Sequence, residues 1–193
     1  MYRIAIFAST RGTDFQAILD ERRAGKIPGI EIACLMTNVK DCGAVAKAEA
    51  AQIPVHFIDP AGKTRGQFDQ EAIKALEPYQ IDLIFLLGYM RIIGPAMVQR
   101  YEGHILNVHP SLLPKFAGGM DTDVHQAVLD AKEQETGMTI HIVTNQLDAG
   151  KIVCQRKVRV AKTDTAETLK AKVQDLEKRW VPKVIKEFAA RSK

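Results

Sequence analysis

The sequence is poor in cysteine and aromatic residues, and it has no long apolar run. Its 3 cysteines, Cys34, Cys42 and Cys154, form no Cys-x-x-Cys pair. An odd number of scattered cysteines excludes a disulfide-stapled miniprotein and argues against a zinc site, and it favours the reducing cytoplasm. Spanning a bilayer takes roughly 18–20 consecutive apolar residues. Without such a run, we predict neither an integral membrane protein nor a membrane partner.

The remaining composition is that of an ordinary globular chain. Of the 193 residues, 46% are hydrophobic and 26% are charged, which excludes a disordered tail and a collagen-like fibre. This length suits one α/β domain, so we predict a single domain over residues 1–193. The apolar stretch at residues 4–8 is too short for the core of a signal peptide, and it predicts a first strand.

Positive charge is concentrated in the C-terminal part of the chain. The net charge is +4, and the segment from Lys151 onward holds 13 Lys and Arg residues against 5 Asp and Glu residues. A nucleic-acid partner would need more than charge, such as a recognition motif, and we predict none. The charge fits a solvated helix face or contact with a small anionic substrate.

Strand and helix patterns alternate along the chain, which is typical of a mostly parallel sheet. We predict strands at residues 2–8, 30–37, 55–58, 82–87, 104–108, 139–143 and 152–160. We predict helices starting at Thr13 or Asp14, at residues 43–51, 67–76 and 124–131, and from 166 to about 189, with a loop at 59–66. The fold class is therefore α/β: a Rossmann-like, open, twisted sheet with helices on both faces and a long C-terminal helix.

The first candidate site is the turn after the first strand, which contains Arg11, Gly12, Thr13 and Asp14. Backbone N–H groups and the dipole of the following helix can hold a phosphate group there. Arg11 could add a charged contact, and the side chain of Thr13 or Asp14 could cap the helix. The turn matches neither the dinucleotide fingerprint nor the P-loop, so an ordinary turn remains an equal alternative.

The second candidate site is the pair Asn107 and His109. Alternation along a strand points both side chains to the same side, and Pro110 and Pro114 make the next loop rigid. An amide donor beside an imidazole suits stabilisation of an oxyanion and transfer of a proton. A structural histidine at a strand end is the open alternative.

The third candidate is Asp148, in a loop between two predicted strands. A carboxylate near His109 would orient the imidazole and raise its proton affinity. Asp148 could instead only organise its own turn, and a separation of 39 residues does not decide between these roles. We predict that His141 is a structural histidine beside the pocket and that His125 lies at a helix start.

These candidates lie in segments that together resemble the folate-dependent formyltransferases. The stretch NVHPSLLP at residues 107–114 is similar to the family signature Asn-x-His-Pro-Ser-Leu-Leu-Pro. The stretch GYMRII at 88–93 resembles the folate-pocket segment of the family, and LDAG at 147–150 resembles its catalytic-aspartate region. The resemblance runs in order from residue 2 to the end, and it is strongest to the branch that acts on glycinamide ribonucleotide.

The resemblance implies an activity and three catalytic residues. The activity is transfer of the formyl group of 10-formyltetrahydrofolate, a co-substrate, to the amine of glycinamide ribonucleotide in purine biosynthesis, without a metal. Asn107 and His109 would bind the oxyanion, and His109 would also take part in proton transfer. Asp148 would position His109 and an ordered water. The partners would be small molecules, and the chain would be a monomer or homodimer.

The resemblance also implies the binding residues, with the phosphate and nucleotide assigned to the N-terminal half and folate binding and catalysis to the C-terminal half. The nucleotide substrate is assigned to Arg11, Gly12, Thr13 and Glu177. The folate is assigned to Arg65, Met90, Arg91, Ile92, Ile93, Leu147 and Ala149.

The sequence departs from the family pattern in two places. The phosphate turn is commonly Gly-x-Gly-Ser-Asn, whereas this chain has Asp14 at the last position, which brings a negative charge near a phosphate unless the side chain caps the helix. The segment 117–125 is longer and more acidic than is common, and it leaves open which residues close over the substrate.

Other members of the family provide alternative functions. Methionyl-tRNA formyltransferase and formyltetrahydrofolate hydrolase each carry a further domain, for which a chain of 193 residues has no room. Formylation of a sugar nucleotide is a further alternative. A non-catalytic module that binds nucleotide or folate is disfavoured because Asn107, His109 and Asp148 are all present.

Overall fold

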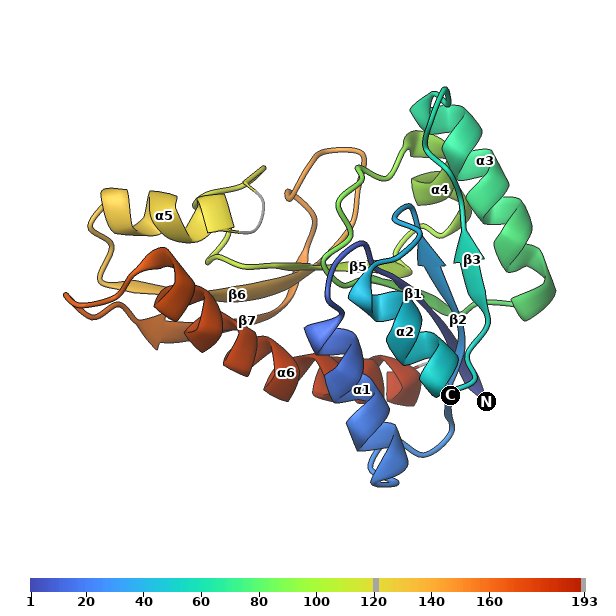
Figure 1. Ribbon diagram of the computed structural model, residues 1–193, viewed down its shortest axis with the longest axis horizontal. Coiled ribbons are helices and arrows are strands. Elements are labelled where there is room, and N and C mark those ends of the chain that lie inside the picture. Colours follow the sequence, from blue (N-terminus) through green and yellow to red (C-terminus); the bar gives the residue numbers. More distant parts are fainter. Residues whose placement is uncertain (120–121, 192–193) are drawn as a thin grey trace.

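The computed structural model describes residues 1–119 and 122–191, which form one seven-stranded sheet of order β3-β2-β1-β4-β5-β6-β7 (Figure 1). Strands β1 to β5 run parallel, and β6 and β7 are antiparallel to their neighbours. The strands are β1 (Tyr2–Phe7), β2 (Ile30–Thr37), β3 (Val55–Phe57), β4 (Leu83–Leu86), β5 (Ile105–His109), β6 (Glu135–Ile142) and β7 (Ile152–Arg159). The predicted α/β, mostly parallel sheet is confirmed.

Helices cover both faces of this sheet, as predicted. Helices α1, α2 and α6 pack on one face, α3 and α4 pack on the other, and α5 packs against α6 (Figure 1). The helices are α1 (Thr13–Arg23), α2 (Gly43–Ala50), α3 (Arg65–Leu76), α4 (Pro95–Arg100), α5 (Thr122–Asp130) and α6 (Ala166–Arg191), with a short 3₁₀ turn at Glu77–Tyr79.

The first strand is apolar on both sides because both sides face helices. Ile4 and Ile6 pack with α1, α2 and α6, whereas Ala5 and Phe7 pack with α3 and α4. Removing each of the larger side chains from water stabilises the fold by about 1.5–3 kcal/mol. The core therefore holds the end of β1 in a fixed position.

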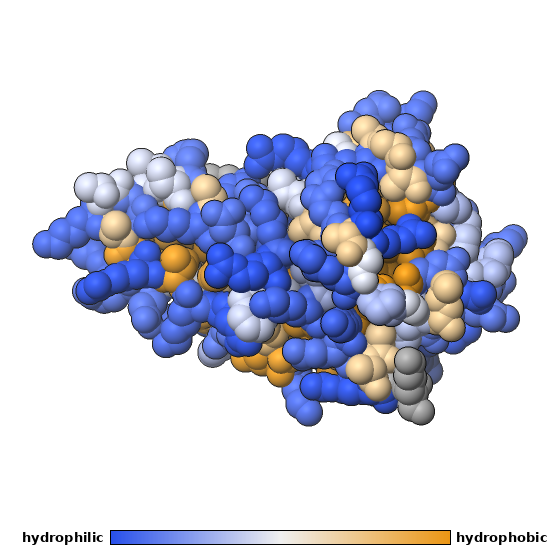
Figure 2. Space-filling view, turned by 90° about the horizontal axis from the view of Figure 1, so that it is seen from below, coloured by the Kyte–Doolittle hydropathy of each residue, from blue (hydrophilic) through white to orange (hydrophobic). Residues whose placement is uncertain are grey.

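The long helix α6 separates its apolar and basic residues. Leu169, Val173 and Val184 are buried against the sheet, whereas Lys178, Lys183 and other cations are exposed. Figure 2, which views the molecule from the side of α1 and α6, shows a mainly hydrophilic surface with scattered apolar patches. The basic C-terminal segment thus presents a solvated helix face.

The observed local structure differs from the predicted one in three places. Arg65 does not lie in a loop but is the first residue of α3, because Thr64 and Gln67 form a capping box that starts the helix early. Helix α4 was not predicted, because a segment of six residues that begins with a proline is too short to show the spacing of apolar residues typical of a helix. Strand β6 also begins earlier than predicted, at Glu135.

The cysteines are buried and free, and Cys34 and Cys154 lie in strands as predicted. Among the helices of residues 1–119 and 122–191, none has the length and apolar character needed to cross a bilayer.

Candidate active site

A pocket of about 680 Å³ opens at the carboxyl ends of the parallel strands. Its walls come from the turn after β1, the segment after β4, the end of β5, the loop between β6 and β7, and α6. Strands β2 and β4 lie on opposite sides of β1, so the chain reverses its direction across the sheet at this point. Open α/β sheets bind ligands at such a switch point.

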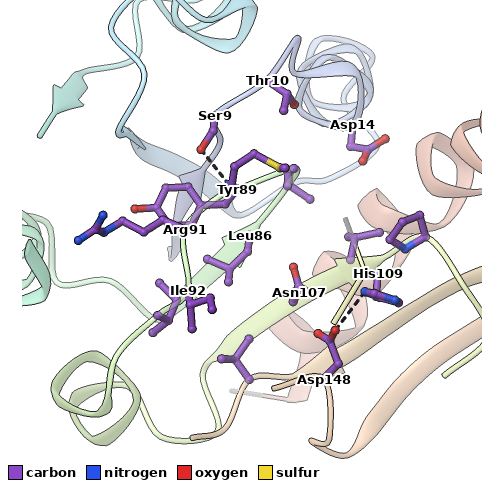
Figure 3. A pocket seen from close by; sticks show the side chains of 18 of the residues that line it. Ser9, Thr10, Asp14, Leu86, Tyr89, Arg91, Ile92, Asn107, His109 and Asp148 are labelled. Carbon is purple, nitrogen blue, oxygen red and sulfur yellow. Dashed lines mark hydrogen bonds and ion pairs between the residues drawn. The ribbon is translucent and has the colours of Figure 1, made fainter. Parts of the chain in front are cut away.

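One end of the pocket holds a cluster of acid–base groups. Nδ1 of His109 lies 3.4 Å from Oδ2 of Asp148, and Nε2 of His141 lies 3.4 Å from Oδ1 of the same carboxylate. The Asp148 side chain is 7% exposed and that of His109 is 4% exposed. Figure 3 shows His109 and Asp148 pointing toward each other across the pocket edge, with Asn107 beside them. A buried carboxylate therefore bridges two imidazoles.

The sheet brings these residues together although they are distant in the sequence. Strand β6 is antiparallel to β5 and places His141 directly opposite Asn107. Asp148 follows in the next loop with a φ of 51°, and its Oδ2 accepts a hydrogen bond of 2.8 Å from the Gly118 N–H. Asp148 therefore contacts other segments and does more than organise its own turn.

The two partners in this cluster have shifted pKa values. Burial lowers the pKa of His109, and this effect outweighs the Asp148 carboxylate and the hydrogen bond to the Phe116 carbonyl, which act to raise it. Burial acts to raise the pKa of Asp148, but hydrogen bonds from His141 and the Gly118 N–H and the nearby imidazoles bring that pKa below its usual value. At neutral pH the site holds a neutral imidazole beside an ionised carboxylate.

His141 orients Asn107. Nδ1 of His141 lies 3.0 Å from the Ile142 carbonyl oxygen, which can only accept, so this nitrogen carries the proton. Nε2 of His141 faces both Nδ2 of Asn107, at 3.2 Å, and Oδ1 of Asp148. The amide has a second N–H, which remains for a group in the pocket.

The turn after β1 forms another wall. Gly12 is the N-cap of α1 with a φ of 68°, and no side chain caps this helix, so the prediction that Thr13 or Asp14 caps it is wrong. A Cβ on Gly12 would lie 2.9 Å from Cα of Ala44, and a Cβ on Gly43 would lie 2.9 Å from the Arg11 carbonyl oxygen. The absence of a side chain at both glycines therefore allows α2 to pack closely against this turn, which lines the pocket.

Asp14 is buried in the same wall, at 8% exposure. Burial raises the pKa of Asp14 to about 7, although the nearby Lys178 acts to lower it. Asp14 stands where the family commonly has asparagine, and its carboxyl group is thus largely neutral below pH 7.

A further wall is apolar and accessible. Val39, Met90, Ile92 and Leu147 are 41–52% exposed and line the pocket. Ser9 fixes this wall, because its Oγ accepts a 3.0 Å hydrogen bond from the Met90 N–H (Figure 3). Accessible apolar residues gathered in a concave site favour a ligand with a flat, apolar part.

The predicted site residues lie largely in this one pocket. Twelve of the fourteen line it: Arg11, Thr13, Arg65, Met90, Arg91, Ile92, Ile93, Asn107, His109, Leu147, Asp148 and Glu177. The other two, Gly12 and Ala149, do not line it, and Gly12 instead shapes the turn. Residues 120 and 121, which belong to the segment 117–125, lie outside the described residues.

Sequence reasoning missed several residues of the pocket. The contact of His141 with Asp148 was not predicted. Lys170 and Gln174 on α6 also line the pocket and were not predicted. The spacing of Lys170, Gln174 and Glu177 on one helix face was the available signal. No group of three or more His, Cys, Asp or Glu residues in the described part of the chain is arranged to hold a metal ion.

The fold and the pocket define a Rossmann-like domain with acid–base groups for chemistry on a small substrate. The model of the family described as formyl transferase matches residues 2–185, and the chain belongs to this family. The family resemblance predicted from the sequence is therefore confirmed.

Individual relatives agree with this assignment. The chain is 38% identical over 189 residues to phosphoribosylglycinamide formyltransferase of Haemophilus influenzae, covering 97% of this chain and 87% of the relative. It is similar to the crystal structure of phosphoribosylglycinamide formyltransferase from Bacillus halodurans, with a TM-score of 0.92 and 36% identity over 99% of this chain and 97% of that chain. Glycinamide ribonucleotide transformylase 1 from Symbiobacterium toebii gives a TM-score of 0.93 and 36% identity over 98% of this chain and 88% of that chain.

Proposed function

We propose that this chain transfers a formyl group from 10-formyltetrahydrofolate to the amine of glycinamide ribonucleotide in purine biosynthesis. The observation that carries the proposal is the cluster of Asn107, His109 and Asp148 at the edge of a pocket with one apolar wall and one wall formed by the turn after β1. The names of the relatives support the choice of this acceptor.

Each catalytic residue has a role that fits its surroundings. The second N–H of Asn107 donates a hydrogen bond to the oxygen that becomes negative when the amine attacks the formyl carbon. His109, neutral at pH 7 because burial lowers its pKa, carries its proton on Nε2, which donates to the Phe116 carbonyl oxygen, and it accepts a proton from the attacking amine at Nδ1 through a water. Asp148 faces Nδ1 of His109 and stabilises the imidazolium formed in this step.

The two co-substrates occupy different walls. The apolar wall of Met90, Ile92 and Leu147 packs on the folate ring system, and Arg91, whose guanidinium carbon lies 4.3 Å above the Phe68 ring, bounds this wall. The donor supplies the formyl group, the imidazolium of His109 returns its proton to the folate nitrogen through the water as the carbon–nitrogen bond breaks, and tetrahydrofolate is the product that leaves. In this arrangement the N-terminal half supplies the phosphate-binding turn. The C-terminal half supplies the catalytic cluster and, together with residues 88–93, the folate wall.

The acceptor lies between the turn after β1 and α6. Arg11 and the first N–H groups of α1 bind its phosphate group, and the Glu177 carboxylate accepts hydrogen bonds from the ribose hydroxyl groups. The enzyme works in the cytoplasm on small molecules, without a nucleic-acid or membrane partner, as a monomer or homodimer.

Purified protein with 10-formyltetrahydrofolate tests the proposal. We expect folate turnover, followed by absorbance, when glycinamide ribonucleotide is present and little turnover when the acceptor is omitted. An amino-sugar nucleotide and methionyl-tRNA are the matched alternative acceptors. Turnover with one of these alone, or release of formate without any acceptor, would refute the proposed acceptor.

A further inference from the structure

Asp14 is a buried carboxyl group that the proposed catalytic steps do not use. It is the second residue of α1, and its Oδ1 has no hydrogen-bond partner among the described residues. It lines the pocket, and Figure 3 shows its carboxyl group projecting from the start of α1. A buried carboxyl oxygen without a partner is less costly when the group is neutral, and the residue that carries it lines the pocket.

The surroundings of Asp14 are those of an anion site. The first N–H groups of a helix have no acceptor within the helix, and the first intrahelical bond of α1 runs from the Gln16 N–H to the Gly12 carbonyl oxygen. The positive end of the helix dipole and the Arg11 side chain favour a negative group at this end of the pocket. A phosphate group bound there comes close to Asp14.

An ionised Asp14 would oppose such a ligand. Two negative charges a few ångströms apart in a partly desolvated site repel by several kcal/mol at an effective dielectric constant of about 20. A neutral carboxyl group removes this repulsion and also provides an O–H donor, which is short and strong when its acceptor is a phosphate oxygen.

We propose that Asp14 binds the phosphate-bearing end of the acceptor as a neutral carboxylic acid and donates its proton in a hydrogen bond to a phosphate oxygen. The proposal deepens the proposed function and rests on it for the identity of the acceptor. It turns the departure from the common asparagine into a conservative replacement, because a protonated aspartate and an asparagine have the same shape and both can donate.

The charged and titratable groups around Asp14 are of both signs, and most are cations. Arg11 lies in the same turn, Cys42 is the N-cap of α2, and three more groups lie on α6: Lys170, Glu177 and Lys178. The attraction of Lys178 acts to lower the pKa of Asp14, yet burial outweighs it and the pKa is about 7 in the free protein. A bound anion raises this pKa further.

The consequence is an acceptor affinity that depends on pH. Because the complex needs the proton on Asp14, affinity is full below the pKa of the free protein and falls as the pH rises above about 7. Titration of the ligand and of other pocket groups also changes affinity with pH, but it acts equally on wild type and on Asp14→Asn, so their ratio isolates Asp14.

Calorimetric titration of the whole protein with glycinamide ribonucleotide between pH 6.0 and 8.5 tests the proposal. We expect the wild-type affinity to fall by about thirtyfold relative to that of Asp14→Asn over this range, with Asp14→Asn binding as well as wild type at pH 6.0. Asp20→Asn, a change to an exposed acid on the same helix, is the matched control and should follow wild type. A constant ratio between wild type and Asp14→Asn, or loss of binding in a folded Asp14→Asn at every pH, would overturn the proposal.

Two measurements separate this proposal from the proposed function. Sulfate stays dianionic over the whole range, so a titration with inorganic sulfate should show the same fall in the ratio of wild-type to Asp14→Asn affinity. The carboxyl ¹³C resonance of Asp14 in the free protein should titrate near pH 7. If glycinamide ribonucleotide binds to no form of the protein, the proposed acceptor fails. Two results would overturn the role of Asp14 even if a different acceptor were correct. One is a ratio of wild-type to Asp14→Asn sulfate affinity that stays constant with pH, and the other is an Asp14 carboxyl group that titrates near pH 4.

Discussion

The pocket contains two buried aspartates in opposite states of ionisation. Asp148 and Asp14 have 7% of the side chain and 8% of the residue exposed, respectively. Hydrogen bonds from His141 and the Gly118 N–H overcome burial at Asp148 and lower its pKa, whereas burial dominates at Asp14 and raises its pKa to about 7. The depth of burial and the donors that face a carboxyl group therefore set its charge together.

The difference in charge between the two aspartates suits the two ends of the pocket. At the catalytic end, a fixed negative charge stabilises a positive charge that forms on His109. At the phosphate end, the ligand itself is negative, and a neutral acid suits it better than a carboxylate. The comparison therefore predicts that a neutral amide damages the first position and is tolerated at the second.

The largest expected effect is the loss of turnover in Asp148→Asn. The amide keeps the shape of the side chain but cannot stabilise the imidazolium of His109, so we expect turnover to fall by about two orders of magnitude or more, as in His109→Ala. Steady-state formyl transfer at saturating substrates measures it, with Asp20→Asn as the control. Near-full activity in either variant would contradict the assigned roles.

The next effect concerns stability at Asp14. Folding raises the pKa of this acid from 3.8 to about 7, so the folded state holds the proton over a range in which the unfolded chain has released it. The wild type must then lose stability relative to Asp14→Asn as the pH rises from about 4 to 7, by on the order of 4 kcal/mol.

Urea unfolding of wild type and Asp14→Asn at pH 4.5 and pH 7.5 measures this difference. The free energy of unfolding should change with pH in favour of the asparagine variant. A pH-independent difference between the two proteins would show that Asp14 is ionised throughout and would remove the contrast with Asp148.

The sequence predicts one of these two regions better than the other. Alternation along a strand places Asn107 and His109 on one side, and the antiparallel pairing of β5 with β6 completes the cluster. The contact of Asp148 with His109 depends on a loop over 30 residues away, which no local pattern encodes. The resemblance of residues 147–150 to the catalytic-aspartate region of the family supplied that link.

The turn after β1 was harder to predict because its conformation depends on tertiary contacts. Capping rules favour Thr13 or Asp14 as the cap, but the close approach of α2 to Gly12 places both residues inside the helix. Asp14 then turns into the pocket rather than to solvent. Burial, which a single sequence does not reveal at this position, changes its chemistry.

A smaller effect links the pKa of His109 to Asp148. The carboxylate acts to raise the pKa of the imidazole, against the larger opposite effect of burial. Asp148→Asn should therefore shift the pKa of His109 still lower than in wild type, where it already lies below 6.5. Titration of the imidazole ¹⁵N resonances measures both values, and an upward shift in the variant would contradict the charge assigned to Asp148.

The smallest expected effect lies on the apolar wall, away from both carboxyl groups. Leu147 is 52% exposed and lines the pocket, so Leu147→Ala removes contact with the folate but little packing in the free protein. Loss of about 1–1.5 kcal/mol of apolar contact raises the KM for 10-formyltetrahydrofolate by about tenfold and leaves kcat nearly unchanged. Phe57→Ala, at an exposed apolar residue outside the pocket, is the matched control and should leave both constants unchanged. If Leu147→Ala lowered kcat as strongly as Asp148→Asn does, the apolar wall would act on the transition state, and the separation between binding walls and catalytic end would not hold.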